Sequence, residues 1–134
     1  MGLTYQGEMG RYIYDMELLK QTAEEAAAGA ALCLDWESYG RGQLVFQEDE
    51  AFKYVEKQIE YQRRNSKTLS RGRVSFQVEL EDDKRGYSRD NREENPAVRV
   101  DIQVEVDEYF SLPFFSVNTL RRSSRYEQAR SEFL

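Results

Sequence analysis

Carboxylates are the side chains in this sequence whose type and spacing could do chemistry. Aspartate and glutamate supply 25 of the 134 residues, and many of them are adjacent. Two carboxyl groups support general acid–base catalysis only when a cleft holds them apart and gives them different pKa values. Because each group here falls on a polar helix face, at a helix start or in a loop, we expect no catalytic residue and no enzyme. The groups are Glu24/Glu25, Glu48/Asp49/Glu50, Glu81/Asp82/Asp83, Glu93/Glu94 and Asp107/Glu108.

Other chemically active residue types are scarce. The chain has no histidine, which excludes imidazole bases and removes the commonest metal ligand. Cys33 is the only cysteine, and since it lies in an alanine-rich run we expect a small buried hydrophobe. Asp101, Glu105 and Asp107 form an outward row of oxygen ligands, but no loop with a turning glycine accompanies them. The sequence therefore predicts neither a metal site nor a cofactor.

Charge argues against a nucleic-acid partner. The chain carries 19 basic against 25 acidic residues, a net charge of −6, whereas nucleic-acid binding depends on an excess of Lys and Arg. Gly40-Arg41-Gly42 lacks the Gly-x-x-x-x-Gly-Lys signature of a phosphate loop. We therefore expect no nucleic-acid partner. The small basic cluster near the C-terminus is interpreted as a solvated face and consists of Arg121, Arg122 and Arg125.

The elements that must position these groups begin with a long helix. Apolar or small side chains recur at alternating spacings of four and three residues, which is the pattern of one apolar stripe. Region 1–35 is therefore predicted to be helical from about Tyr5 to Leu34. The alanines of the stripe would let a neighbouring helix or sheet approach closely. The stripe consists of Tyr12, Met16, Leu19, Ala23, Ala26, Ala30 and Cys33.

The rest of the chain predicts a second helix and then a sheet. Region 36–66 holds a turn and a helix from Glu48 to Arg64. In region 72–134 the apolar period changes to two over residues 74–80 and 98–106, which predicts an antiparallel pair laid over a helix. Together these regions predict a single α+β domain, residues 1–134, with a pilin-like arrangement: a long N-terminal helix packed on a small antiparallel sheet, with a second, shorter helix.

Two further segments have less regular patterns. The polar connection 82–96 is expected to be a mobile loop. Residues 117–120 are a candidate third, edge strand, and the state of the tail beyond Arg121 stays open. Between them lies an aromatic bend around Pro113, which forms either core packing or, where exposed, a protein interface. The candidate aromatic interface is Phe110, Phe114 and Phe115.

The N-terminal segment resembles a known family. Gly7-Glu8-Met9-Gly10-Arg11-Tyr12, followed by the leucine and alanine-rich run from Leu18 to Ala31, is similar to the start of TadE/TadG-type proteins. These are the pseudopilin-like components of tight-adherence (Flp-type) pilus assembly. A strand pair and a Leu-Pro-aromatic bend at residues 112–115 resemble the family in outline. The matching positions are Glu8, Arg11, Leu19, Ala23, Ala26 and Ala27.

The resemblance implies a function without chemistry. In the family an apolar membrane helix precedes the position of Glu8, whereas only residues 1–6 precede that step here. The chain would then be the soluble ectodomain of a membrane-anchored minor pilin or assembly factor on the extracytoplasmic face of the cell envelope. Its expected partners are other pilus subunits, assembly proteins and further copies of itself. The alternative is a soluble interaction or phage-like structural module with no membrane anchor, which the reading frame upstream of Gly2 would distinguish.

The first turns of the long helix are the candidate assembly surface. A small sheet covers only one side of a helix of about 30 residues, which would run near 45 Å. We therefore expect residues 3–16 to project beyond the sheet and to offer apolar and aromatic side chains to a neighbouring subunit or the bilayer interface. The candidate residues are Tyr5, Met9, Tyr12, Ile13 and Met16.

Overall fold

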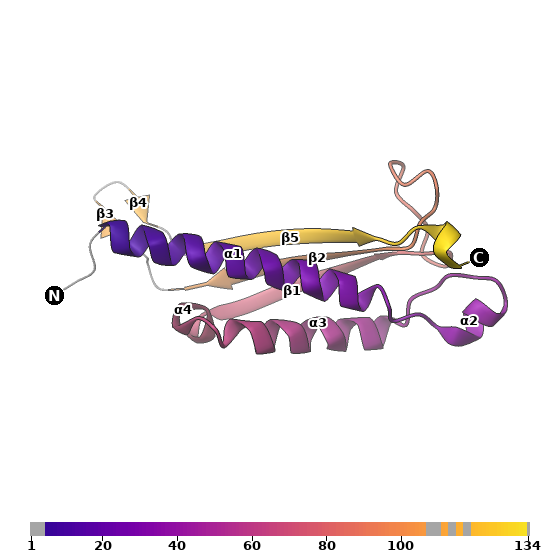
Figure 1. Cartoon of the computed structure of the whole chain (residues 1–134), viewed down its shortest axis with the longest axis horizontal. Coiled ribbons are helices and arrows are strands. Elements are labelled where there is room, and N and C mark those ends of the chain that lie inside the picture. Colours follow the sequence, from indigo (N-terminus) through magenta and orange to yellow (C-terminus); the bar gives the residue numbers. More distant parts are fainter. Residues whose placement is uncertain (1–4, 107–110, 113–114, 117–118, 134) are drawn as a thin grey trace.

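The computed structural model describes residues 5–106, 111–112, 115–116 and 119–133, with side chains described for 9–106 and 119–133. Helices precede strands along most of the chain, as predicted, and the fold class is α+β (Figure 1). The helices are α1 (Tyr5–Ala30), α2 (Trp36–Gly40), α3 (Glu48–Arg63), α4 (Lys67–Arg71) and the 3-10 helix η1 (Arg130–Phe133). The strands are β1 (Arg73–Glu81), β2 (Ala97–Glu105), β3 (Ser111–Leu112), β4 (Phe115–Ser116) and β5 (Thr119–Glu127).

Three of the strands form one antiparallel sheet in the order β1-β2-β5. Val100 in the central strand lies opposite Val78 of β1 and Ser124 of β5. The inward side chains of β2 are fully buried, since β2 has a strand on each side. Those of β1 are half-buried because β1 is an edge strand. The short strands β3 and β4 pair with each other in a separate sheet.

Helices α1 and α3 lie side by side over one face of this sheet (Figure 1). Helix α1 contacts β2 and β5, while Phe52 of α3 lies on Phe76 of β1 with ring centroids 4.9 Å apart. The sheet formed by residues 74–80 and 98–106 is thus covered by helix on its apolar face, as predicted, but α1 covers β2 and β5 while α3 reaches β1. The core between the layers includes Leu19, Ala23, Ala26, Ala30, Val55, Ile59, Leu69, Val98, Val100, Ile102, Val104 and Leu120.

The small residues of α1 bring α3 very close. A Cβ built on Gly29 would lie 2.1 Å from ring atoms of Tyr54, so only glycine leaves room for that ring. Farther along the same contact, the side chain of Gln62 donates a hydrogen bond to Glu25 at 2.7 Å. The close approach to α3 thus lies at Gly29 and Glu25, which are not part of the predicted stripe, while the stripe's alanines Ala23, Ala26 and Ala30 are fully buried.

Two sequence-based boundaries differ from the structure. Helix α1 ends at Ala30, because Leu34 instead forms a β-bridge with Phe46. The third strand begins near its predicted place but continues to Glu127. The sequence of this strand does not alternate between apolar and polar residues, because Arg122 and Ser124 lie on the face toward α1. The strand is defined by backbone pairing with β2 rather than by apolar side chains.

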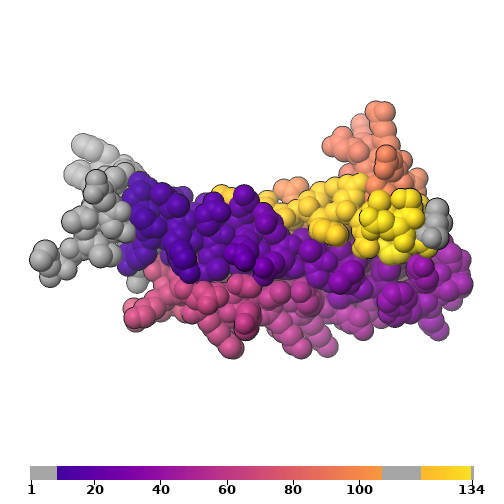
Figure 2. Space-filling view, in the orientation of Figure 1, coloured from indigo at the N-terminus to yellow at the C-terminus, as the bar shows by residue number. Residues whose placement is uncertain are grey.

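The 82–96 connection is held by internal hydrogen bonds that its polar composition did not predict. Asp82, Asn91 and Asn95 are buried within it, and each makes hydrogen bonds with backbone groups. It stands out from the body at the same end of the molecule as α2 (Figures 1 and 2). Composition alone gave no sign of this, because these polar side chains form the interior of the connection itself.

Candidate functional site

The predicted assembly surface on α1 is divided between two sides of the helix. Met9, Tyr12 and Met16 pack against the core, contrary to the expectation that these turns project beyond the sheet. Ile13 is exposed, as is its neighbour Tyr14, with more than half of each side chain's surface open to solvent. Tyr5 starts the helix, and its side chain lies outside the described part of the chain. Sheet coverage therefore extends farther toward the N-terminus than the helix length suggested.

The predicted aromatic interface falls largely outside the described residues. Phe110 and Phe114 are both in this group. Phe115 opens β4, where its backbone is described and its side chain is not. The hypothesis that these three side chains meet a partner therefore stays a prediction.

A different aromatic surface is present where α2 meets the C-terminal turn. Trp36 is 68% exposed and contacts Tyr39 edge-to-face, with ring centroids 5.6 Å apart. Tyr39 in turn lies 6.3 Å from the Phe133 ring and donates its hydroxyl hydrogen to the Phe133 carbonyl oxygen at 3.1 Å. Leu32, just after α1, is 67% exposed. We call the three contacting residues, Trp36, Tyr39 and Phe133, the aromatic tip.

Exposed acidic side chains lie on α2 and on the start of α3, two segments that backbone hydrogen bonds hold together. The amide of Asp35 donates to the carbonyl of Val45 at 2.8 Å, and the amide of Gln47 donates to Cys33 at 2.7 Å. These two bonds join the segments on either side of α2. The exposed acids brought to this end are Glu37 of α2 and Glu48, Asp49 and Glu50 of α3, which we call the acidic rim.

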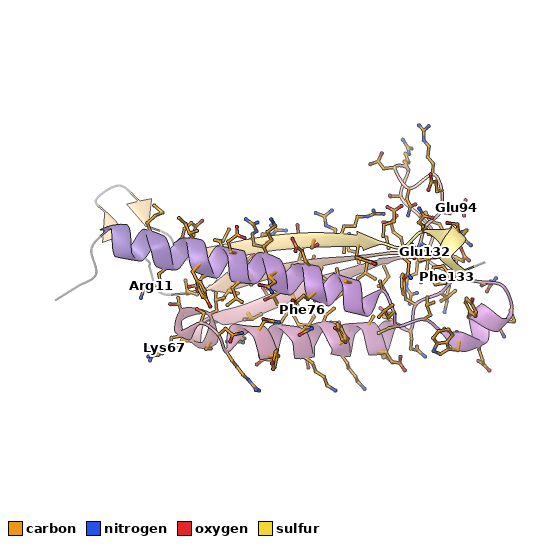
Figure 3. The ribbon with its side chains drawn as sticks, viewed as in Figure 1. Arg11, Lys67, Phe76, Glu94, Glu132 and Phe133 are labelled. Atoms are coloured by element: carbon orange, nitrogen blue, oxygen red, sulfur yellow. The ribbon has the colours of Figure 1, made fainter. Side chains whose placement is uncertain are left out.

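The opposite end of the molecule carries a basic cleft. Its volume is about 510 Å³, and it opens between α1, α4 and the adjoining ends of β1 and β2. Arg11 and Lys67 reach this end from different helices (Figure 3). Four of the lining side chains are cationic and one is anionic, in a protein whose net charge is −6. The lining consists of Arg11, Lys67, Thr68, Arg71, Gly72, Arg73, Glu105 and Val106.

Hydrogen bonds from the side chain of Arg63 to backbone carbonyl groups position α4 along the cleft. Arg63, at the end of α3, donates to the carbonyl oxygens of Leu69, Ser70 and Gly72 at 2.8–3.2 Å. Gly72 passes so close to β2 that an added Cβ would lie 2.5 Å from a methyl carbon of Val104. Arg73 and Glu105 face each other across the sheet, with 3.9 Å between their charged atoms and both side chains mostly exposed. The cleft floor is thus fixed while its cationic side chains stay at the surface.

Buried Asp82 anchors the 82–96 connection to the strand-like segment before α3. One carboxylate oxygen accepts the amide of Phe46 at 3.0 Å and the guanidinium of Arg85 at 2.5 Å. The other accepts the amides of Lys84 and Arg85 at 3.1 and 2.7 Å. Every bond to this carboxylate is local or structural, so Asp82 organises the backbone.

The neighbouring carboxylates are tied to cations in the same way. Burial raises the pKa of Asp83, but a hydrogen-bonded ion pair with Arg130 and the Leu44 amide outweigh it and lower that pKa. In Glu81, burial is likewise outweighed by bonds from the Ser88 amide and Arg125, which lower its pKa to about 2.

Tyr87 completes this polar network. Burial and its hydrogen bond to Asp83 raise the pKa of the Tyr87 hydroxyl. Arg130 also donates to that hydroxyl at 2.9 Å. Acid–base catalysis needs a carboxyl that exchanges protons near neutral pH, whereas Asp83 and Glu81 are held as anions by arginine. The arrangement is that of a structural clamp between the connection and the C-terminal turn.

Metal and thiol chemistry can be assessed over the described residues. Within them, His, Cys, Asp and Glu form no group of three or more that could hold a metal ion. Asp101, part of the candidate calcium row, lies 3.6 Å from Arg99 and 3.9 Å from Arg121. Asp107 lies outside the described residues. Cys33 is half-buried, and burial together with Glu50 raises the pKa of its thiol.

The aromatic tip and the basic cleft were both missed by the sequence analysis. The one available signal for the tip was a lone tryptophan in a turn-like segment. The cleft gave no local signal, because its bases come from α1, α4 and β1. Among the described residues, no helix has the length and apolar character needed to cross a membrane. Compared with protein families, curated proteins and solved structures, the chain matches none.

Proposed function

We propose that this protein is a non-enzymatic component of a pilus or secretion apparatus, a membrane-anchored minor pilin or assembly factor that acts by subunit packing on the extracytoplasmic face of the cell envelope. The observation that carries the proposal is the placement of α1. Its 26 residues lay a small-residue stripe on an antiparallel sheet, and its first turns lie at one end of an elongated molecule (Figures 1 and 2).

This arrangement supports a role in holding and connecting. A helix of 26 residues is a rigid rod of about 39 Å, and burying one side of it against a sheet makes helix and head a single body. A segment preceding α1 would therefore set the position of the entire head. The exposed side chains available for packing include Ile13 and Tyr14 near one end and Trp36 at the other. The expected partners are other assembly subunits and further copies of the chain.

Photo-crosslinking in the native cell tests the proposal. A photoreactive amino acid at Ile13 or Trp36 should capture other envelope assembly subunits, because both side chains are exposed. The same residue placed at Ala27, which is buried, is the matched control and should capture none. Deleting the gene should also remove the surface filaments or the secreted product, and the gene supplied in trans should restore them.

A specific set of results would contradict the proposed function. Crosslinks confined to cytoplasmic proteins, unchanged filaments on deletion and an in-frame stop directly before Met1 would overturn the proposal. That combination would instead support a soluble interaction or phage-like structural module without an anchor. An apolar run of about 20 residues upstream of Gly2 would support the membrane-anchored assignment.

A further inference from the structure

We infer that the basic cleft binds the acidic rim and aromatic tip of a second copy of this chain, head to tail. This rests on the proposed function in that it treats the chain as an assembling subunit, and it adds the partner and the two surfaces. The argument depends on two patches that differ in charge, come from different elements and lie at opposite ends of the molecule (Figure 1).

The cleft is suited to an anionic partner. Lys67 and Arg71 are exposed on α4, and Arg73 adds a third cation whose contact with Glu105 is long and solvent-exposed. Such an exposed pair contributes little stability to the fold. A local excess of positive charge on an acidic protein attracts an anionic surface and accelerates its encounter. A volume of about 510 Å³ also admits whole side chains.

The other end supplies an anionic surface with an apolar centre. Acids in the first turn of α3 favour the helix dipole, which accounts for Glu48, Asp49 and Glu50 within the fold. Glu37 likewise lies in the first turn of α2, whereas no helix dipole accounts for Trp36, which leaves 68% of its surface in solvent. An exposed aromatic anchor beside charged side chains has the anatomy of a protein interface.

The geometry determines the kind of assembly. Helix α3 alone separates the two ends by about 24 Å over its 16 residues. One molecule therefore cannot satisfy its own cleft with its own rim. A contact between two different patches is heterologous, and when its rotation does not close a ring it continues as an open chain of subunits. The second copy at the cleft thus leaves its own cleft available for a third.

Charge exchange between the two ends is the decisive experiment. Sedimentation velocity of the purified protein should show concentration-dependent association in about 0.05 M salt that weakens about tenfold in about 0.5 M salt. The cleft variant K67E/R71E and the rim variant E37K/D49K should each remain monomeric. Mixing the two should restore association, because each variant then meets an oppositely charged surface on the other.

Three controls keep the result interpretable. K57E reverses an exposed charge in the middle of α3 and should associate like the parent. Trp36→Ala should weaken association in low salt. Equal melting temperatures for all variants would show that each charge variant is folded.

Two results would overturn the inference. One is a parent that stays monomeric at every concentration and salt, and the other is a mixture that fails to recover association. A monomeric parent that binds phosphatidylglycerol vesicles through the cleft would also overturn it, and would assign the cleft to phosphate groups of a membrane. Crosslinking to other envelope subunits in cells could still succeed in each case, so failure here is distinguishable from failure of the proposed function.

Discussion

The ring of Tyr54 lies directly against the backbone of Gly29, where a Cβ would come within 2.1 Å of it. The two residues belong to α3 and α1, and the contact sets how near these helices approach. Side-chain size at one position of α1 therefore controls the layer that covers the sheet.

Gly29→Ala should destabilise the protein by about 1–3 kcal/mol, because the added methyl group displaces the Tyr54 ring from a packed interface. Gly10→Ala is the matched control: it lies in the same helix, and nothing is within 4 Å of its added Cβ. That change should stabilise the helix by up to about 1 kcal/mol. Urea unfolding measures both, and a Gly29→Ala protein as stable as the parent would contradict the packing described here.

Asp82→Ala should cost about 3–5 kcal/mol, because it leaves the amides of Phe46, Lys84 and Arg85 and the Arg85 guanidinium without their common acceptor. Asp82→Asn should cost less, since the amide oxygen retains part of the accepting capacity. Asp90→Ala removes an exposed carboxylate of the same connection and should leave the unfolding midpoint unchanged. Equal loss in the Asp82→Ala and Asp90→Ala variants would be inconsistent with an anchoring role.

Stability should fall with acid through the Glu81 carboxylate. Its pKa is about 2 in the folded protein against an ordinary value of 4.5, so the unfolded chain binds the proton more readily. The stabilisation is therefore complete above about pH 4.5 and is lost as the pH falls from there toward about 2. Glu81→Gln should flatten the melting-temperature profile over that interval. An E81Q profile parallel to that of the parent would refute the assignment to Glu81, and E56Q is a control remote from the network.

Cys33 should react slowly with alkylating reagents at pH 8. Burial raises the pKa of the thiol, and Glu50 raises it further, so little of the reactive thiolate is present. Glu50→Gln should increase the alkylation rate, by less than full unfolding does because burial is the larger cause. Mass spectrometry follows the rate, and E56Q is the matched control. A parent that reacts as fast as a free cysteine peptide would show the thiol to be open.

Regular apolar spacing is what made much of this fold predictable. The stripe containing Leu19 and Ala23 located α1, and the alternation around Val78 and Val100 located β1 and β2 as an antiparallel pair. In each case, the spacing of the residues on the buried face shows whether the segment is a helix or a strand. The same rule failed for β5, where backbone pairing to β2 acts on residues such as Arg122 and Ser124 whose types say little about strand formation.

The surfaces were harder to predict than the core because they are formed by residues distant in sequence. Arg11 and Lys67 meet at one end only after α1 and α4 have packed. Trp36 contacts Tyr39, and Tyr39 in turn contacts Phe133, which is distant in sequence. The polar 82–96 connection is a further case, because Asp83 forms an ion pair with Arg130 and no local sequence pattern relates these two residues.

The polar network that joins the 82–96 connection to the C-terminal turn also affects the order of folding during synthesis. Asp82 bonds to Phe46 across 36 residues, and Asp83 bonds to Arg130 across 47. Contacts this distant along the chain close late, because the intervening segment must first lose its conformational freedom. Arg130 follows β5 in the chain, so a ribosome-bound chain can pair α1 with α3 long before this end can close. This end of the molecule is therefore completed only after the chain has been synthesised through Arg130.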